Sequence, residues 1–112
     1  MPEKRSQPAQ PVACNLGAFS AAERERHAAL LRRLGERMLE TRELPDGYAY
    51  RFAPEPGTIA ELGEWVGLER ACCPFLRFTL EVEPDDGPVW LRLTGSSQVK
   101  EFVAATFRPG KP

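Results

Sequence analysis

Hydrophobic residues recur every three or four positions in three segments of the chain and alternate with polar residues in four others. The first pattern predicts helices that bury one side, and the second predicts strands that bury one face. The helices are expected to begin at the cap-forming residues Ser20, Thr58 and either Ser96 or Ser97. The strands are expected over residues 39–44, 48–53, 76–83 and 89–93.

Two of the helix starts have the form of a capping box, in which a hydroxyl residue precedes a glutamate by three positions. Ser20 stands in this relation to Glu23, and Thr58 to Glu61. The prolines and glycine of segment 54–57 are expected to break the chain before the second helix, and Pro74 to end that helix. The inner sides of the first two helices are predicted to consist of His27, Leu30, Leu31, Leu34 and Met38, and of Ile59, Leu62, Trp65, Val66, Cys72 and Cys73.

Turn-forming residues separate the members of each pair of strands. Segments 45–47 and 84–88 combine proline, aspartate and glycine, which favours two hairpins. The element order α-β-β-α-β-β-α then predicts an α+β fold, an antiparallel sheet of about four strands with three helices on one face. We expect residues 1–12, with their prolines, to form a disordered tail, and residues 13–108 to form a single domain.

Composition excludes several classes of function. The chain has 112 residues and a formal net charge of −1, without the basic field that nucleic-acid binding requires. No apolar run approaches the roughly 20 residues of a membrane span, and the first residues do not resemble a signal peptide. We therefore expect a cytoplasmic protein whose cysteines are reduced. A homodimer remains open.

Two of the three cysteines, Cys72 and Cys73, are adjacent and lie directly before Pro74, whereas Cys14 precedes the first helix. An odd number of cysteines argues against a simple framework of structural disulfides. In a reducing compartment, such thiols serve packing, metal binding or redox chemistry. The end of the second helix is thus the predicted functional site.

Helical spacing places Glu69 three and four residues before the cysteine pair, so all three side chains are predicted to face the same way. A carboxylate on a buried stripe is costly without a partner. Arg70 and Arg77 flank the corner and are possible partners, and a role for Glu69 as a ligand or in proton transfer is equally open.

Thiolates select soft ions such as Cu(I), Zn(II), Hg(II) and As(III). A helix C-terminus disfavours a thiolate unless a cation is present, which favours metal binding over a highly reactive nucleophile. His27 could complete a four-coordinate zinc set, although its position beside Leu30 is also typical of a buried structural histidine. The predicted metal ligands are Cys14, Cys72, Cys73 and Glu69.

Two other interpretations stay open. In the first, the same cysteines serve a thiol-redox enzyme or sensor, with Cys14 as the resolving thiol. In the second, the cysteines are structural, and the chain is a non-catalytic module that binds a ligand or a protein. The sequence alone does not decide whether the chain is an enzyme or which metal it takes.

Segment 69–78 resembles a group of small bacterial proteins that share an E-R-x-C-C-P-F-x-x-F core. These proteins also have an upstream cysteine, here Cys14, and a Leu-Thr-Gly segment before the final helix, here residues 93–95. The similarity covers most of residues 13–107. Because the group looks like proteins encoded alongside heavy-metal resistance functions, mercury resistance above all, the resemblance implies a role with a soft metal.

Overall fold

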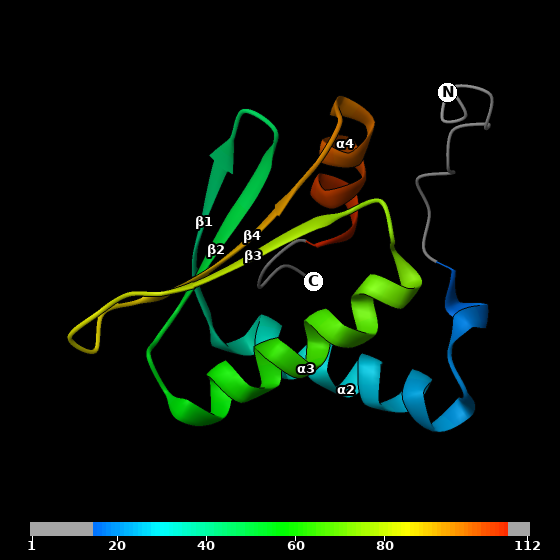
Figure 1. Cartoon of the computed structure of the whole chain (residues 1–112), viewed down its shortest axis with the longest axis horizontal. Coiled ribbons are helices and arrows are strands. Elements are labelled where there is room, and N and C mark those ends of the chain that lie inside the picture. The colour runs from blue at the N-terminus through cyan, green and yellow to red at the C-terminus, as the bar shows by residue number, and fades with distance from the viewer. Residues whose placement is uncertain (1–14, 108–112) are drawn as a thin grey trace, which may run out of the picture.

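The computed structural model describes residues 15–107. The expected tail, Cys14 and residue 108 lie outside this range. The elements, shown in Figure 1, are η1 (Leu16–Ala18), α2 (Ala21–Arg37), β1 (Met38–Leu44), β2 (Gly47–Phe52), α3 (Pro56–Cys72), β3 (Arg77–Val82), β4 (Val89–Thr94) and α4 (Ser97–Thr106).

The four strands form one antiparallel sheet in the order β1-β2-β4-β3. The second strands of the two hairpins therefore pair with each other at the centre of the sheet. Below the sheet in Figure 1, α2 and α3 run side by side, and α4 packs against β2 and β4. This arrangement confirms the predicted α+β fold and its element order.

The first predicted capping box is confirmed, and the second is wrong. The backbone N–H of Glu23 donates to the Ser20 hydroxyl, and the backbone N–H of Ser20 donates to the Glu23 carboxylate. In contrast, α3 begins at Pro56 and has no side-chain cap bond. Proline suits a first helical position because its φ is already helical and its missing N–H has no partner there. Thr58 is instead buried and accepts a hydrogen bond from Arg37.

One hydrophobic core joins all three α-helices to the same face of the sheet. Within this core, the Tyr50 hydroxyl donates a hydrogen bond of 3.3 Å to the Phe107 carbonyl oxygen. The opposite face of β4 carries Trp90, which is also buried, with the Arg42 guanidinium 4.6 Å from its ring centroid. The largest fully buried side chains are Tyr50, Phe52, Leu30, Leu62, Leu93, Glu69, Val89, Val103, Thr58, Cys72 and Cys73.

The predicted inner face of β3 is only partly buried. Leu76, just before the strand, is buried, but Leu80 and Val82 are 37% and 52% exposed. Figure 1 shows the reason: β3 is an edge strand, and the turn that joins it to β4 projects from the body of the sheet. Alternation of polar and apolar residues marks the inner face of a strand, but it does not show how far the helices cover that face.

Ion pairs fix the position of α2 against α3. Glu61 accepts from Arg33 and Arg37, and Glu64 accepts two hydrogen bonds from Arg26. The arginines of these pairs are exposed, whereas the buried residues of both helices belong to the core that they share with the sheet. None of the helices within residues 15–107 is long and apolar enough to cross a membrane.

Candidate functional site

The last turn of α3 carries Glu69, Cys72 and, as the cap residue, Cys73. The helix closes with a hydrogen bond of 2.6 Å from the Cys73 backbone N–H to the Glu69 carbonyl oxygen. Pro74 follows, and its missing N–H and its ring prevent another helical turn. The corner therefore holds two thiols and a carboxylate on one short piece of backbone.

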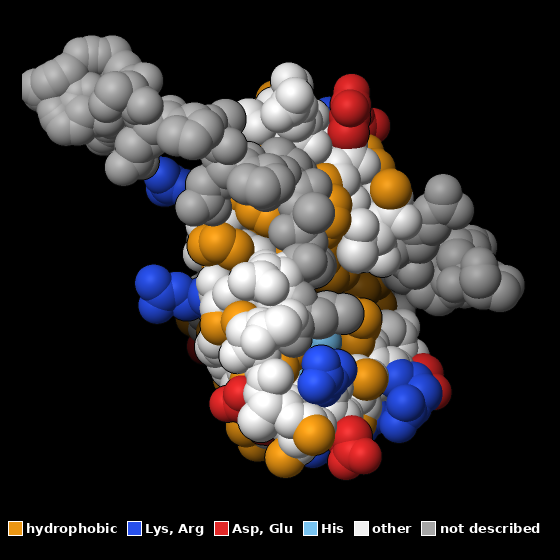
Figure 2. All heavy atoms as spheres, turned by 90° about the vertical axis from the view of Figure 1, so that its right-hand side faces the viewer, with side chains coloured by type: hydrophobic (Ala, Val, Ile, Leu, Met, Phe, Trp, Pro, Cys, Tyr) orange, Lys and Arg blue, Asp and Glu red, His pale blue; other side chains and the backbone are white. Residues whose placement is uncertain are grey.

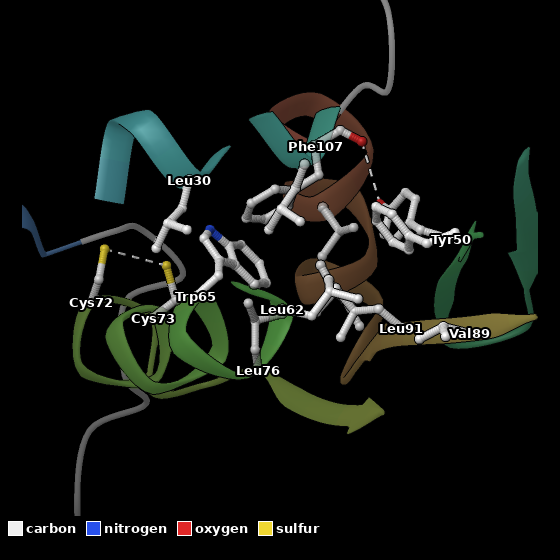
Figure 3. Close-up of a cluster of buried hydrophobic side chains, with 14 of the residues drawn as sticks. Leu30, Tyr50, Leu62, Trp65, Cys72, Cys73, Leu76, Val89, Leu91 and Phe107 are labelled. Atoms are coloured by element: carbon white, nitrogen blue, oxygen red, sulfur yellow. Dashed lines mark hydrogen bonds between the residues drawn. The ribbon is translucent and has the colours of Figure 1, made fainter. Parts of the chain in front are cut away.

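The three side chains converge as their spacing predicts. One ligand atom from each of Glu69, Cys72 and Cys73 lies within 4.8 Å of the other two. The two sulfur atoms are 3.6 Å apart, and Figure 3 shows them next to each other at the edge of the core. All three residues have a relative exposure of 0%. A compact and fully enclosed donor set of two sulfurs and one carboxylate thus exists at this corner.

Glu69 pairs with His27 rather than with Arg70 or Arg77. The distance from Glu69 Oε1 to His27 Nε2 is 2.5 Å, and both arginines are exposed. The physical reason is the packing of α2 on α3, which places the histidine over the buried side of α3, whereas the arginines remain exposed to solvent. A hydrogen bond between these two atoms requires one proton between them.

His27 is held by aromatic neighbours as well as by the carboxylate. Its ring centroid lies 5.1 Å from that of Phe19 and 6.4 Å from that of Trp65. Figure 2 shows only a small area of the chain's single histidine, in pale blue, at the surface. Within residues 15–107 the group of side chains that could hold a metal ion comprises the glutamate and the two cysteines without His27. The histidine therefore orients the carboxylate and does not add a fourth donor.

Two buried polar atoms at this corner have no hydrogen-bond partner among the described residues, Glu69 Oε2 and Trp65 Nε1. The first can only accept unless it is protonated, and the second can only donate. Such atoms are rare in folded proteins because leaving one without a partner costs about 1–3 kcal/mol. The hydrophobic pattern predicts Trp65 as a packing residue on the inner side of α3, and its position one turn before Glu69 places both on the same side of the helix.

Cys14 lies outside the described residues. The backbone N–H of its neighbour Asn15 donates to the Cys72 carbonyl oxygen at 2.8 Å. The first described residue is therefore hydrogen-bonded to the end of α3.

The complete burial of both thiols argues against the interpretation of the cysteines as redox-active groups. Cysteines that react with oxidants or with other proteins are usually partly exposed. Cys72 and Cys73 are not, and their sulfur atoms face the core and each other. Enclosure of this kind suits a held ion or a structural role better than exchange with a large redox partner.

A cavity also lies between the helices and the sheet. It has a volume of about 220 Å³ and mostly apolar walls. One side of it is formed by Trp65, so this indole separates the cavity from the cysteine corner. The cavity is lined by Leu31, Leu34, Gly35, Met38, Tyr50, Phe52, Leu62, Trp65, Leu91, Leu93, Thr106 and Phe107.

No protein-family model, no curated protein and no solved structure matches this chain. The function is therefore inferred from the geometry and chemistry of the corner itself.

Proposed function

We propose that this protein binds a thiophilic metal or metalloid ion, of the group Hg(II), As(III), Zn(II) and Cu(I), through the thiols of Cys72 and Cys73. The observation that carries the proposal is the convergence of two sulfurs and a carboxylate within 4.8 Å in a fully buried corner. Glu69 supplies the oxygen of the site.

The spacing of the sulfurs favours one kind of coordination. Two sulfurs 3.6 Å apart, each about 2.3 Å from a shared ion, make an angle of about 100° at that ion. This angle suits a tetrahedral or pyramidal ion that takes further ligands. A linear ion would need the sulfurs on opposite sides of it, so Hg(II) or Cu(I) would also draw on a third donor here.

We propose Cys14 as that further sulfur. The support is the hydrogen bond from Asn15 to the Cys72 carbonyl oxygen, which ties the residue following Cys14 to the corner. A third thiolate would complete a trigonal set for a soft ion or, with the Glu69 carboxylate, a four-coordinate set for zinc.

His27 would orient the Glu69 carboxylate without binding the ion itself. A hydrogen-bonded carboxylate is held in one orientation and is a more effective ligand than a mobile one. Because Oε1 is engaged with His27, Oε2 is the oxygen that remains for the ion or its ligands. The resemblance to proteins of heavy-metal resistance supports a biological setting in which a toxic ion is captured.

Native mass spectrometry of the reduced full-length chain tests the proposal, with Hg(II), As(III) and Zn(II) added separately. We expect one ion per chain and its loss in the double variant Cys72→Ser, Cys73→Ser. The Cys14→Ser variant measures the contribution of the third thiol. Undiminished binding in the double variant would refute the proposal.

The apolar cavity favours a second candidate function, a module that binds a small apolar molecule between the helices and the sheet. An apolar fluorescent probe should then bind the wild-type chain, and Leu91→Trp, which fills the cavity, should prevent it. If Cys72→Ser, Cys73→Ser abolished ion binding while leaving probe binding intact, the two sites would be independent. Absence of probe binding to the wild-type chain would remove this candidate.

A further inference from the structure

The polar atoms around the cysteine corner indicate that the ligand carries a hydrogen-bonding group in addition to the ion. Two sulfurs lie 3.6 Å apart there, Glu69 Oε2 lacks a donor, and Trp65 Nε1 lacks an acceptor within residues 15–107. In Figure 3 the indole nitrogen lies on the side of the ring that faces the sulfurs. A hydroxyl group is the smallest group that both donates and accepts a hydrogen bond.

We propose that the ligand of this site is a trivalent metalloid hydroxide, of which arsenous acid is the simplest member. This inference rests on the proposed function, because Cys72 and Cys73 remain the groups that capture the ion. The metalloid keeps one hydroxyl after binding these two thiols, before the Cys14 thiol exchanges with that hydroxyl and releases it as water. That hydroxyl donates to Glu69 Oε2 and accepts from Trp65 Nε1–H.

The capture reaction balances without an oxidant or a reductant. Arsenous acid, As(OH)₃, reacts with two Cys–SH groups to give (Cys–S)₂As–OH and two water molecules. Two S–H and two As–O bonds break, while two As–S and two O–H bonds form, and each thiol proton leaves in a water molecule. For such a ligand, Oε2 accepts a hydrogen bond from the hydroxyl instead of coordinating the metalloid directly.

His27 fixes the position of the metalloid's hydroxyl, because it contacts both residues that bind this group. His27 bonds to Oε1 and stacks on Trp65, so one ring sets the orientation of both groups that bind the hydroxyl. Trp65 is 2% exposed and Glu69 is 0% exposed, so bulk water does not compete at either atom. The site thereby distinguishes a hydroxylated metalloid from a soft cation that carries no hydroxyl.

The test compares arsenous acid with Hg(II) by isothermal titration of the reduced full-length chain. All proteins carry Cys14→Ser, because the third thiol would compete for the position of the hydroxyl. We expect Trp65→Phe to weaken the binding of arsenous acid about tenfold or more, since it removes one buried donor, and to leave the binding of Hg(II) unchanged. Trp90→Phe is the matched control, because Trp90 lies on the far face of the sheet and should affect neither ion.

Equal weakening of both ions by Trp65→Phe would overturn the inference, because it would indicate a packing role alone. No effect on either ion would also overturn it, because it would mean that the indole N–H is satisfied by a structural water. If the double variant Cys72→Ser, Cys73→Ser still bound both ions, the proposed function itself would be refuted. The outcomes are therefore distinguishable.

X-ray absorption at the arsenic edge gives a measurement that does not depend on the folding of Trp65→Phe. In the Cys14→Ser protein we expect two sulfur neighbours and one oxygen neighbour around arsenic. Arsenic with one sulfur, or without an oxygen neighbour, would contradict the inference.

Discussion

Glu69 is a glutamate with no exposed surface, and its neighbours determine what it can do. A buried carboxylate is tolerated when its oxygens have partners, and here the structure provides one partner, His27, for one oxygen. The other oxygen, Oε2, has no partner among residues 15–107. At the scale of single residues, this imbalance between donors and acceptors distinguishes the corner from an ordinary patch of hydrophobic core.

The contribution of His27 can be measured with His27→Phe, which keeps an aromatic ring beside Phe19 and Trp65 but removes Nε2. We expect the free energy of unfolding in urea to fall by about 2–4 kcal/mol, because both oxygens of Glu69 are then buried without a partner. Adding Glu69→Met should restore part of the loss. Purely additive effects of the two substitutions would show that the residues do not interact.

Tyr50 gives a prediction about alkaline pH. Burial raises the pKa of its phenol, with a smaller contribution from the nearby Tyr48, above the ordinary value of 10.0. Above that pH the unfolded chain loses this proton while the folded chain keeps it, so the unfolded state binds fewer protons. The free energy of unfolding should therefore fall as the pH rises above about 10.

Tyr50→Phe removes this source of alkaline sensitivity. At neutral pH we expect it to cost about 0.5–1.5 kcal/mol through loss of the hydrogen bond to the Phe107 carbonyl oxygen. The difference from wild type should shrink above pH 10, as measured by urea unfolding across the pH range. Tyr48→Phe, on the same strand and only partly buried, is the control. A constant difference at all pH values would contradict the prediction.

At the scale of elements, the close approach of β2 to β4 depends on glycine. Gly47 opens β2 and lies opposite Thr94 in the ladder. A Cβ atom at this position would overlap the carbonyl oxygen of Leu93, which belongs to the backbone and has no alternative rotamer. The pairing of the two hairpins at the centre of the sheet therefore requires the absence of a side chain here.

Gly47→Ala should destabilise the domain by more than about 2 kcal/mol, because the central strands must separate to admit the methyl group. Gly63→Ala is the matched control in α3, where an added Cβ meets no atom within 4 Å. It should stabilise the domain by about 0.5–1 kcal/mol through helix propensity. Thermal unfolding monitored by circular dichroism measures both changes, and similar effects of the two substitutions would argue against the close approach.

At the scale of the whole molecule, the corner joins three parts of the chain that are distant in sequence. α3 supplies the thiols and the carboxylate, α2 supplies the histidine, and the segment before η1 is attached to the end of α3 through Asn15. An ion held at this point would connect parts that separate when the chain unfolds, so ion binding and folding should be linked.

The melting temperature of the reduced chain should accordingly rise with the concentration of arsenous acid. At an ion concentration about 100 times the Kd, linkage adds about 2.7 kcal/mol to the free energy of unfolding. The double variant Cys72→Ser, Cys73→Ser should show no such rise. An equal rise in the variant would place the bound ion elsewhere on the chain.

Much of the fold follows from local patterns in the sequence. Periodicity and turn residues predict all three α-helices and both hairpins, and Pro74 correctly ends α3. The main error is the predicted start of α3 at Thr58. The residues from Thr58 onward have the form of a capping box, but the helix already begins at Pro56. The exposure of Val82 was not predictable either, since it depends on how far the helices extend beneath the sheet.

The convergence of Glu69, Cys72 and Cys73 can be predicted from the sequence, because a spacing of three and four residues on one helix is a local property. The partner of Glu69 cannot be predicted in this way, because His27 lies 42 residues away and reaches the glutamate through the packing of α2 on α3. The same packing encloses the indole N–H of Trp65 and leaves it without an acceptor among residues 15–107. The physical reason is that helical geometry fixes neighbours within one turn, whereas the burial and pairing of polar groups depend on which elements come together in space.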